Sequence, residues 1–443
     1  MFKKILIANR GEIALRVIRA CKEMGIATVA IYSKADEESL HVKLADESVC
    51  VGPAQARLSY LNVAAIMSAA ELTGVDAIHP GYGFLAENAD FARVCEQCNV
   101  TFIGPKPDHI SKMGDKATAR QIAKAAGVPI LPGSGIIQDA EEAQKIAKEI
   151  GYPVILKATA GGGGRGIQII YHPSQLSTAF ERVRTEAAAA FGVGDCYIEK
   201  YCEHPRHIEI QVVCDSHGTQ LHLGERDCTI QRRHQKILEE SPSPVVDASL
   251  RAKMGAAALK LCKTVGYVNV GTVEFLVDEK KNFYFMEMNT RIQVEHPVTE
   301  LVTGVDLIHE QIQIASGQAA SFKQDQVRLS GHAIECRICA EDPIRMAPSP
   351  GLITAYHPPG GFGVRVDSFV YQQYKVLPFY DSMIAKLICC AATREGAIAK
   401  IASALSEYVI AGIQTNIPFQ RKILLHTKFK SAQFDTHFLE EFM

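Results

Sequence analysis

Two glutamates and an asparagine on one predicted hairpin could hold a metal ion. Residues 271–289 contain two strand-like runs around a polar turn centred on Lys280–Lys281. Pairing across that turn places Glu274 opposite Glu287, with Asn289 on the same face. Opposed carboxylates in a mostly apolar hairpin repel each other, and a shared divalent cation removes the conflict. Ligands that offer only oxygen favour Mg²⁺ or Mn²⁺. The alternative, a pair of solvated edge carboxylates, is disfavoured by the apolar neighbours.

The segment that follows carries a second set of charged side chains. If strand alternation continues beyond the hairpin, Arg291, Gln293 and Glu295 share one face beside the metal site. A guanidinium next to a carboxylate suits the binding of a small oxyanion and the removal of its proton. A purely structural ion pair between Arg291 and Glu295 explains the spacing equally well.

A glycine-rich loop upstream has the composition of a phosphate-binding segment. Lys157 ends an apolar strand, and residues 161–166 contain four consecutive glycines, an arginine and a further glycine. Glycines let backbone N–H groups approach phosphate oxygens closely. Residues 167–171 have a strand pattern, so neither a dinucleotide-binding helix nor a Walker loop is predicted. We expect a flexible flap over phosphates; the alternative is a surface hairpin without a ligand.

Further polar residues predict a lined cleft. The run 225–236 is densely polar where a strand should alternate, although charged runs usually form solvated surfaces. Upstream, alternation points His207, Glu209 and Gln211 to one side of a strand. Two Cys-x-x-Cys pairs, at 95/98 and 336/339, lack the geometry of a zinc chelate in their predicted elements, and we do not assign them to zinc.

These groups must be positioned by several domains. The chain has 443 residues, enough for two to four domains. A short strand, a helix and a second strand over residues 4–32 predict a parallel sheet, and the first turn lacks the glycine pattern of an NAD site. Proline- and glycine-rich linkers near 105–107 and 127–135 precede a compact α+β segment, and a β-rich section closed by a helix follows residue 330.

Composition excludes several classes of protein. Lys and Arg number 47 against 49 Asp and Glu, so there is no basic excess for nucleic acid or membrane surfaces. The 13 cysteines are odd in number and irregularly spaced, which favours a reduced compartment over a disulfide scaffold. The first apolar run is too short for a signal peptide, and no run approaches the roughly 18 residues of a membrane span. We expect a cytoplasmic protein.

The motifs together resemble the biotin carboxylase family, the ATP-grasp component of biotin-dependent carboxylases, over nearly the whole chain. The similarity is carried by residues 8–14, 79–88, 287–296 and 380–384. It implies a fold of α/β and α+β character: a Rossmann-like N-terminal domain over 1–112, an ATP-grasp domain over 113–325 and a β-rich C-terminal domain over 330–443. The ATP-grasp domain would include a mobile lid at about 131–202.

The resemblance also implies a role for each matching position. The residues implied to bind ATP are Lys116, Lys157, Gly163, Gly164, Glu199, Lys200, Tyr201, Cys202, His207, Gln231, His234, Glu274 and Glu287. Those implied to hold two Mg²⁺ or Mn²⁺ ions are Glu274, Glu287 and Asn289. Those implied to surround bicarbonate are Lys236, Arg291, Gln293, Val294 and Glu295, and those implied to face biotin are Arg337, Tyr82 and Gly83. Arg291, Glu295, Lys236 and Arg337 would be catalytic. Ala160 and Cys202 depart from the family pattern, which puts the ATP affinity in doubt.

The implied reaction is the ATP-dependent carboxylation of biotin by bicarbonate, through carboxyphosphate. It would be the first half-reaction of acetyl-CoA carboxylase, which supplies malonyl-CoA for fatty acid synthesis; the alternative is a component of another acyl-CoA or pyruvate carboxylase. The nearest match to a biotinylation motif, at Lys253, lacks the preceding methionine, and the chain ends at Met443. We therefore expect a separate biotin carboxyl carrier protein, carboxyltransferase subunits and a homodimer as partners.

Two other functions are compatible with the fold. Another ATP-grasp ligase, such as one that carboxylates a purine intermediate, is disfavoured by Arg337 and Tyr82. A catalytically inactive nucleotide sensor is disfavoured by the complete set of charged residues between Glu274 and Glu295. Phosphate release that depends on both bicarbonate and biotin distinguishes these possibilities.

Overall fold

A parallel sheet forms the N-terminal region, as the opening strand–helix–strand pattern predicts. A computed structural model describes residues 1–159 and 166–442. The sheet has five strands in the order β3-β2-β1-β4-β5. The three central strands are largely buried because most of their side chains are apolar. The strands are β1 (Lys4–Ile7), β2 (Ala27–Ser33), β3 (Glu47–Gly52), β4 (Ala77–His79) and β5 (Thr101–Phe102). The helices are α1 (Gly11–Glu23), α2 (Leu40–Leu44), α3 (Val63–Thr73), α4 (Ala89–Gln97) and α5 (Pro107–Gly114).

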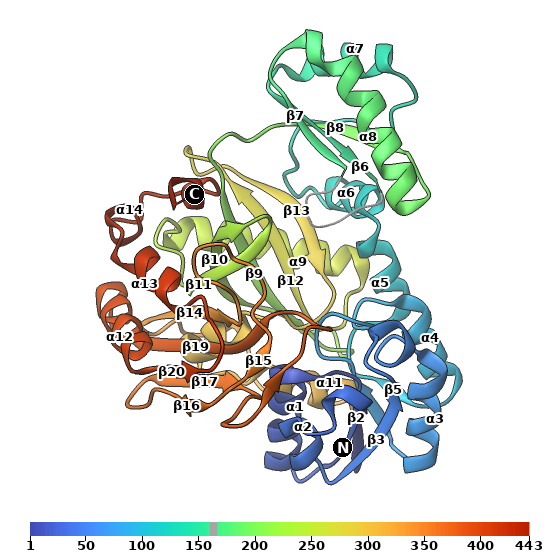
Figure 1. Ribbon diagram of the computed structural model, residues 1–443. Helices are drawn as coiled ribbons and strands as arrows, with labels where there is room; N and C mark the ends of the chain where they lie inside the picture. Colours follow the sequence, from blue (N-terminus) through green and yellow to red (C-terminus); the bar gives the residue numbers. More distant parts are fainter. Residues whose placement is uncertain (160–165, 443) are drawn as a thin grey trace.

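A small antiparallel sheet with two helices projects from the body, at the top of the view in Figure 1. Its strand order is β7-β6-β8, and Leu156, Phe180 and Ile198 belong to its own buried core. The strands are β6 (Val154–Ala158), β7 (Ile167–Ile170) and β8 (Cys196–Lys200); the helices are α7 (Ala140–Ile150) and α8 (Leu176–Phe191), with α6 (Lys116–Ala125) at the base. The strands on either side of the glycine loop are confirmed, but Gly163 and Gly164 lie outside the described residues.

An antiparallel sheet of eight strands forms the body, in the order β13-β12-β9-β10-β11-β14-β19-β17. Because β11 pairs with β14, this sheet runs from the central region into the C-terminal region without a break. Its strands are β9 (Arg206–Cys214), β10 (Gln220–Arg232), β11 (Gln235–Ser241), β12 (Asn269–Val277), β13 (Phe283–Asn289), β14 (His332–Cys339), β17 (Val364–Ser368) and β19 (Met383–Ala391). Central helices are α9 (Ala248–Val265), α10 (His296–Thr303) and α11 (Leu307–Ala315).

The C-terminal helices and short strands complete this body. The remaining strands are β15 (Gly351–Leu352), β16 (Ala355–His357), β18 (Lys375–Val376) and β20 (Val409–Ala411). The helices are α12 (Arg394–Glu407), α13 (Ile417–Leu425) and α14 (Thr427–Lys430), and α12 packs on β19. No helix in the described part of the chain is long and apolar enough to cross a membrane.

The predicted hairpin is confirmed, with one correction near its turn. Glu274 pairs with Glu287 as expected, but the register shifts by one residue between Glu274 and Phe275. Towards the turn Phe275 therefore pairs with Phe285, and the chain reverses between Asp278 and Asn282, whose backbone groups hydrogen-bond at 2.9 Å. The turn centres on Lys280 rather than between two lysines, and the bulge restores the predicted pairing at the glutamates.

Candidate active site

A cleft of about 1580 Å³ lies where the lid, the N-terminal region and the large sheet meet. The predicted site residues that line it are Tyr82, Gly83, Lys116, Lys157, Lys200, Tyr201, Cys202, His207, Gln231, His234, Lys236, Glu274, Glu287, Asn289, Arg291, Gln293, Val294, Glu295 and Arg337. Residues separated by as much as 255 positions in the chain, such as Tyr82 and Arg337, thus share one cavity. Their individual roles remain predictions.

The carboxylate of Glu274 is surrounded by hydrogen-bond donors. Lys236 Nζ lies 2.9 Å from Oε1, and His207 Nε2 lies 2.8 Å from Oε2. The side-chain amides of Asn289 and Gln293 each donate to Oε1 at 2.8 Å. Burial favours the neutral acid, but Lys236 and His207 outweigh it and hold the pKa of Glu274 well below its ordinary value. Glu274 is therefore charged at neutral pH.

The opposite carboxylate, Glu287, has no such support. Among the described residues, no hydrogen bond or ion pair reaches it, and burial together with the charge on Glu274 raises its pKa. Its carboxylate and that of Glu274 come from directly paired positions, so both can offer oxygen to one cation. The Asn289 amide oxygen accepts from Arg291 at 2.9 Å and retains a second lone pair. The three residues fit an oxygen-ligated divalent cation.

Lys236, Glu295 and Arg337 form the charged floor of the cleft. Lys236 Nζ is 2.6 Å from Glu295 Oε1, and Arg337 Nη2 is 3.0 Å from Glu295 Oε2. Burial opposes ionisation, but these two cations and Arg226 hold the pKa of Glu295 far below its ordinary value. Arg337 also donates from Nε to Glu239 Oε1 at 2.6 Å. A carboxylate between two cations becomes more basic when an entering anion draws those cations away.

Arg291 reaches the cleft in a different way from the one predicted. Strand β13 ends at Asn289, and residues 290–295 form turns rather than a strand, so the alternating face does not exist. Arg291, Gln293 and Glu295 nevertheless all line the cavity. Arg291 Nε donates to Glu87 Oε2 at 2.8 Å, and Glu87 Oε1 accepts from the Thr290 backbone N–H at 3.1 Å. An acidic residue of the N-terminal region thus fixes this segment, which we name the 290–295 loop.

Glu199, which is predicted to bind ATP, is not among the residues that line the cleft, and its carboxylate is held by two cations. Its Oε2 accepts from Lys157 Nζ at 2.6 Å, and Oε1 is paired with Arg120 of α6. The neighbouring residues Lys200, Tyr201 and Cys202 do line the cavity. Successive side chains of a strand point to opposite faces. The backbone of Glu199 can therefore face the cleft while its side chain points away from the cleft. Glu199 therefore anchors Lys157 and joins the lid to its base.

Arg226 is a buried hub that motif reasoning did not identify. Its guanidinium is paired with Glu209 and donates to Gln211 Oε1 and to Gln293 Oε1, each at 2.6 Å. Gln293 in turn donates to Glu274. The signal in the sequence was the alternation of His207, Glu209 and Gln211, whose common direction is confirmed, but nothing local showed which cation they face.

We predict that Arg226→Ala costs about 3–5 kcal/mol of folding free energy, because it leaves the buried Glu209 carboxylate without its guanidinium. The side chain of Arg226 is fully buried, so water cannot replace the lost donors. Urea unfolding of the mutant and of Arg328→Ala, an exposed arginine on the connection before β14, measures the difference. Equal midpoints for the two variants would show that the hub contributes nothing.

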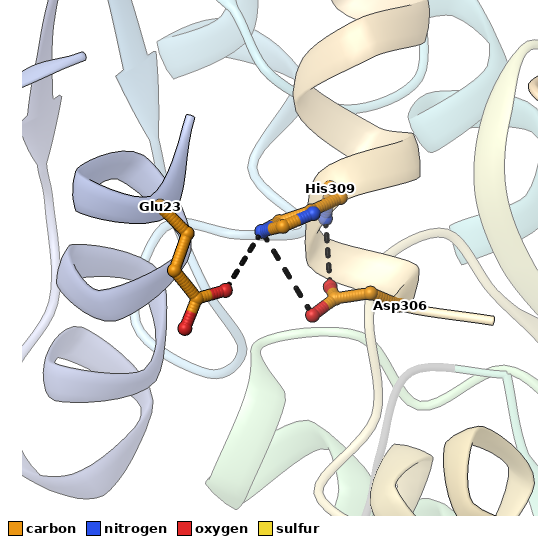
Figure 2. Close-up of side chains that lie close together, drawn as sticks. All are labelled: Glu23, Asp306 and His309. Atoms are coloured by element: carbon orange, nitrogen blue, oxygen red, sulfur yellow. Dashed lines mark hydrogen bonds and ion pairs between the residues drawn. The ribbon is translucent and has the colours of Figure 1, made fainter. Parts of the chain in front are cut away.

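A second group of acidic and imidazole side chains lies on α1 and α11 (Figure 2). His309 Nε2 is 3.2 Å from Glu23 Oε2 and 3.9 Å from Asp306 Oδ2. Asp306 is already engaged, because Oδ2 pairs with Arg16 at 2.6 Å and Oδ1 caps α11 by accepting from the His309 backbone at 2.9 Å. This group connects two helices and is not assigned to a ligand.

Three family models match consecutive parts of the chain. They are the "Biotin carboxylase, N-terminal domain" at residues 1–110, the "Carbamoyl-phosphate synthase L chain, ATP binding domain" at 115–322 and the "Biotin carboxylase C-terminal domain" at 335–441. Together these matches cover nearly the whole sequence in the order that the resemblance predicted.

Individual relatives match over their full length. Biotin carboxylase 1 of Bacillus subtilis is 60% identical, over 100% of this chain and 99% of its own. A crystal structure of the biotin carboxylase–beta-gamma-ATP complex from Campylobacter jejuni has a TM-score of 0.97 at 50% identity, covering 100% of this chain and 99% of that one. The biotin carboxylase domain dimer of the Hydrogenobacter thermophilus 2-oxoglutarate carboxylase, with MgADP, ADP and bicarbonate, has a TM-score of 0.95 at 52% identity, covering 100% and 98%.

Proposed function

This chain belongs to the biotin carboxylase family, and we propose a division of labour among its residues for the ATP-dependent carboxylation of biotin by bicarbonate. The enzyme is a ligase of the ATP-grasp type with a mixed α/β fold. Its substrates are ATP, bicarbonate and biotin, and its metal is Mg²⁺ or Mn²⁺. The observation that carries the proposal is the joint position of Lys236, Glu295 and Arg337 on the cleft floor beside Glu274 and Glu287.

The lid side of the cleft is assigned to ATP. Lys157 and Lys116 would offer positive charge to phosphates, and His207, Gln231 and His234 also line the cleft. Lys200, Tyr201 and Cys202 would bind the adenine end, and Gly163 and Gly164 would cover the phosphates. Glu274, Glu287 and Asn289 would hold the divalent cations, whose chemistry is to neutralise charge on the transferring phosphoryl group.

The cleft floor is assigned to bicarbonate, with Glu295 as its base. Arg291, Lys236, Gln293 and Val294 all line the cleft and would surround the bicarbonate there. When bicarbonate draws Lys236 and Arg337 towards its own oxygens, Glu295 loses the charges that depress its pKa and can accept the proton. The deprotonated oxygen then attacks the γ-phosphate of ATP and forms carboxyphosphate, while ADP leaves.

The N-terminal rim is assigned to biotin. Carboxyphosphate would break down to CO₂ and phosphate in a cleft that excludes water. The phosphate would take the N1′ proton of biotin, and the deprotonated N1′ would then bond to the CO₂. Arg337 would stabilise the negative charge that develops on the ureido oxygen, and Tyr82 and Gly83 would lie beside the ring. Asn9 shapes this rim, because its amide donates to the carbonyl oxygens of Pro80 and Tyr82 at 2.7 and 2.8 Å.

Membership of the family suggests partners for this enzyme. We propose that biotin arrives on a separate carboxyl carrier protein, that carboxyltransferase subunits use the product in the cytoplasm, and that the enzyme is a homodimer. The Hydrogenobacter thermophilus relative is a dimer and part of a 2-oxoglutarate carboxylase, so relatives this similar serve different acceptors. We propose acetyl-CoA as the final acceptor, with another acyl-CoA or pyruvate as the alternative. The domain boundaries at 112/113 and 325/330 are likewise our assignment.

Phosphate release by the purified protein tests this function. We expect release from ATP to require bicarbonate and to rise with biotin, because the nucleophile is bicarbonate and biotin removes the product. If phosphate were released at the same rate with and without bicarbonate, water would be the nucleophile and the proposed function would be wrong. Adding carrier and carboxyltransferase subunits with acetyl-CoA or pyruvate then identifies the acceptor.

A further inference from the structure

A fully buried lysine holds the 290–295 loop from below. Lys386 lies on β19 with no exposed surface. Its Nζ donates to the Val294 carbonyl oxygen at 2.8 Å and is 3.0 Å from Glu12 Oε1. Three regions meet at this ammonium group: the C-terminal strand that carries it, the loop assigned to bicarbonate and the first turn of α1. It lies behind the cleft rather than in it, since Lys386 is absent from the cavity lining.

Glu12 continues the connection to the N-terminal rim. Its Oε1 also accepts the hydroxyl of Tyr82, whose ring lines the cleft, and the ring centroid of Tyr82 is 6.0 Å from Lys386 Nζ. Glu12 is almost wholly buried, so water does not compete for either bond. A single oxygen therefore joins the tyrosine assigned to biotin to the lysine that holds the bicarbonate loop.

We propose that Glu12 and Lys386 are positioning residues that couple the biotin side of the cleft to the bicarbonate loop, through the series Tyr82, Glu12, Lys386 and the Val294 carbonyl. We name this series the Tyr82–Val294 link. The inference rests on the proposed function and adds a connection between its two halves. Glu12 is among the residues that line the cleft, but its Oε1 is engaged by Tyr82 and Lys386, and Lys386 lies behind the cleft.

The charges explain why this link transmits a displacement. Lys386 is stabilised by Glu12 and Asp367 and opposed by Arg365, all close to it in the structure. Glu335 also faces it, but burial holds the pKa of Glu335 well above its ordinary value and makes it the weaker partner. Breaking one contact leaves a buried charge without its partner, which is costly, so the connected groups move together. A shift of Tyr82 is therefore felt at Val294, next to the base Glu295.

Tyr82→Phe gives the decisive test, because it removes only the hydroxyl that reaches Glu12. We expect the KM for bicarbonate, measured at saturating ATP and biotin, to rise about 10-fold, the effect of losing one bond to a charged group, while the KM for ATP stays unchanged. Glu12→Gln keeps an oxygen that can accept from Tyr82 and Lys386 but loses the negative charge. It should also raise the KM for bicarbonate. Tyr356→Phe, whose hydroxyl meets Tyr408 at 3.0 Å, is the matched control.

Lys386→Met extends the test to the other end of the link. It should raise the KM for bicarbonate at least as much, whereas Lys400→Met, which removes a lysine bonded to the Cys390 carbonyl at 2.6 Å, should not. If Tyr82→Phe and Glu12→Gln alter only the KM for biotin, the link is wrong and the proposed function survives. If the wild-type enzyme releases no phosphate in response to bicarbonate, both fail together.

Discussion

Replacing Glu295 with alanine should abolish bicarbonate-dependent phosphate release and carboxybiotin formation together. Glu295 is the proposed base, and no carboxyphosphate forms without deprotonated bicarbonate. Loss of a positioned base lowers rates by about 100- to 10,000-fold. The mutation also leaves Lys236 with Glu209 and Glu274, at 2.6 and 2.9 Å, so the cleft keeps most of its ion pairs. Parallel assays of phosphate and carboxybiotin measure the two losses.

Arg337→Ala should separate the two activities that Glu295→Ala removes together. Its charge is needed when the ureido oxygen becomes negative, so carboxybiotin formation should fall by about 100- to 1000-fold while bicarbonate-dependent phosphate release persists. The variant leaves the buried Glu239 unpaired, and its pKa, which burial already raises to about 7, should rise further. Arg337→Ala combined with Glu239→Gln removes that charge and serves as the control. If Arg337→Ala lost both activities in the same proportion, as Glu295→Ala is expected to do, this division of labour would be wrong.

Glu287→Gln should abolish ATP turnover and leave the fold intact. The substitution removes one charged ligand from the proposed cation site and ends the repulsion with Glu274 across the paired strands. Thermal stability without metal should therefore stay level or rise. Glu279→Gln, on the exposed turn of the same hairpin, is the matched control and should keep wild-type turnover. Wild-type turnover by Glu287→Gln at limiting Mg²⁺ would overturn the assignment.

The pH dependence of stability offers a second measure of Glu287. Its pKa is raised in the folded protein, so the folded state binds the proton more tightly than the unfolded chain. In the absence of metal, this group should stabilise the wild-type protein as the pH falls through the raised pKa towards the ordinary glutamate value. Glu287→Gln lacks that gain. As the pH falls, the melting temperature of the wild type should therefore rise relative to that of Glu287→Gln, and a constant difference between the two would contradict the raised pKa.

Local patterns predicted the elements that short-range chemistry determines. The alternation in residues 271–289 was enough to pair Glu274 with Glu287, because a hairpin joins residues close in sequence. The strands on either side of the glycine loop followed from apolar runs of the same kind. The bulge beside Glu274 was not predictable, since a one-residue shift changes no composition.

Contacts between distant segments were beyond such patterns. The pairing of Arg291 with Glu87 joins residues separated by 204 positions, and Lys386 reaches Val294 across 92. The continuity of the large sheet through β11 and β14 likewise depends on tertiary packing. The contact between Lys157 and the Glu199 carboxylate is a further example, because it joins residues separated by 42 positions.

The central claim is that bicarbonate itself attacks ATP beside Glu295, and transfer of an oxygen isotope tests it most directly. Bicarbonate labelled with oxygen-18 should pass one labelled oxygen to each phosphate released, because the C–O bond breaks when carboxyphosphate decomposes. Mass spectrometry of the phosphate, after brief turnover with wild-type enzyme, ATP and biotin, measures the transfer. Labelled phosphate formed in step with ADP is the expected result. Phosphate whose one added oxygen comes from water and not from bicarbonate would contradict the account.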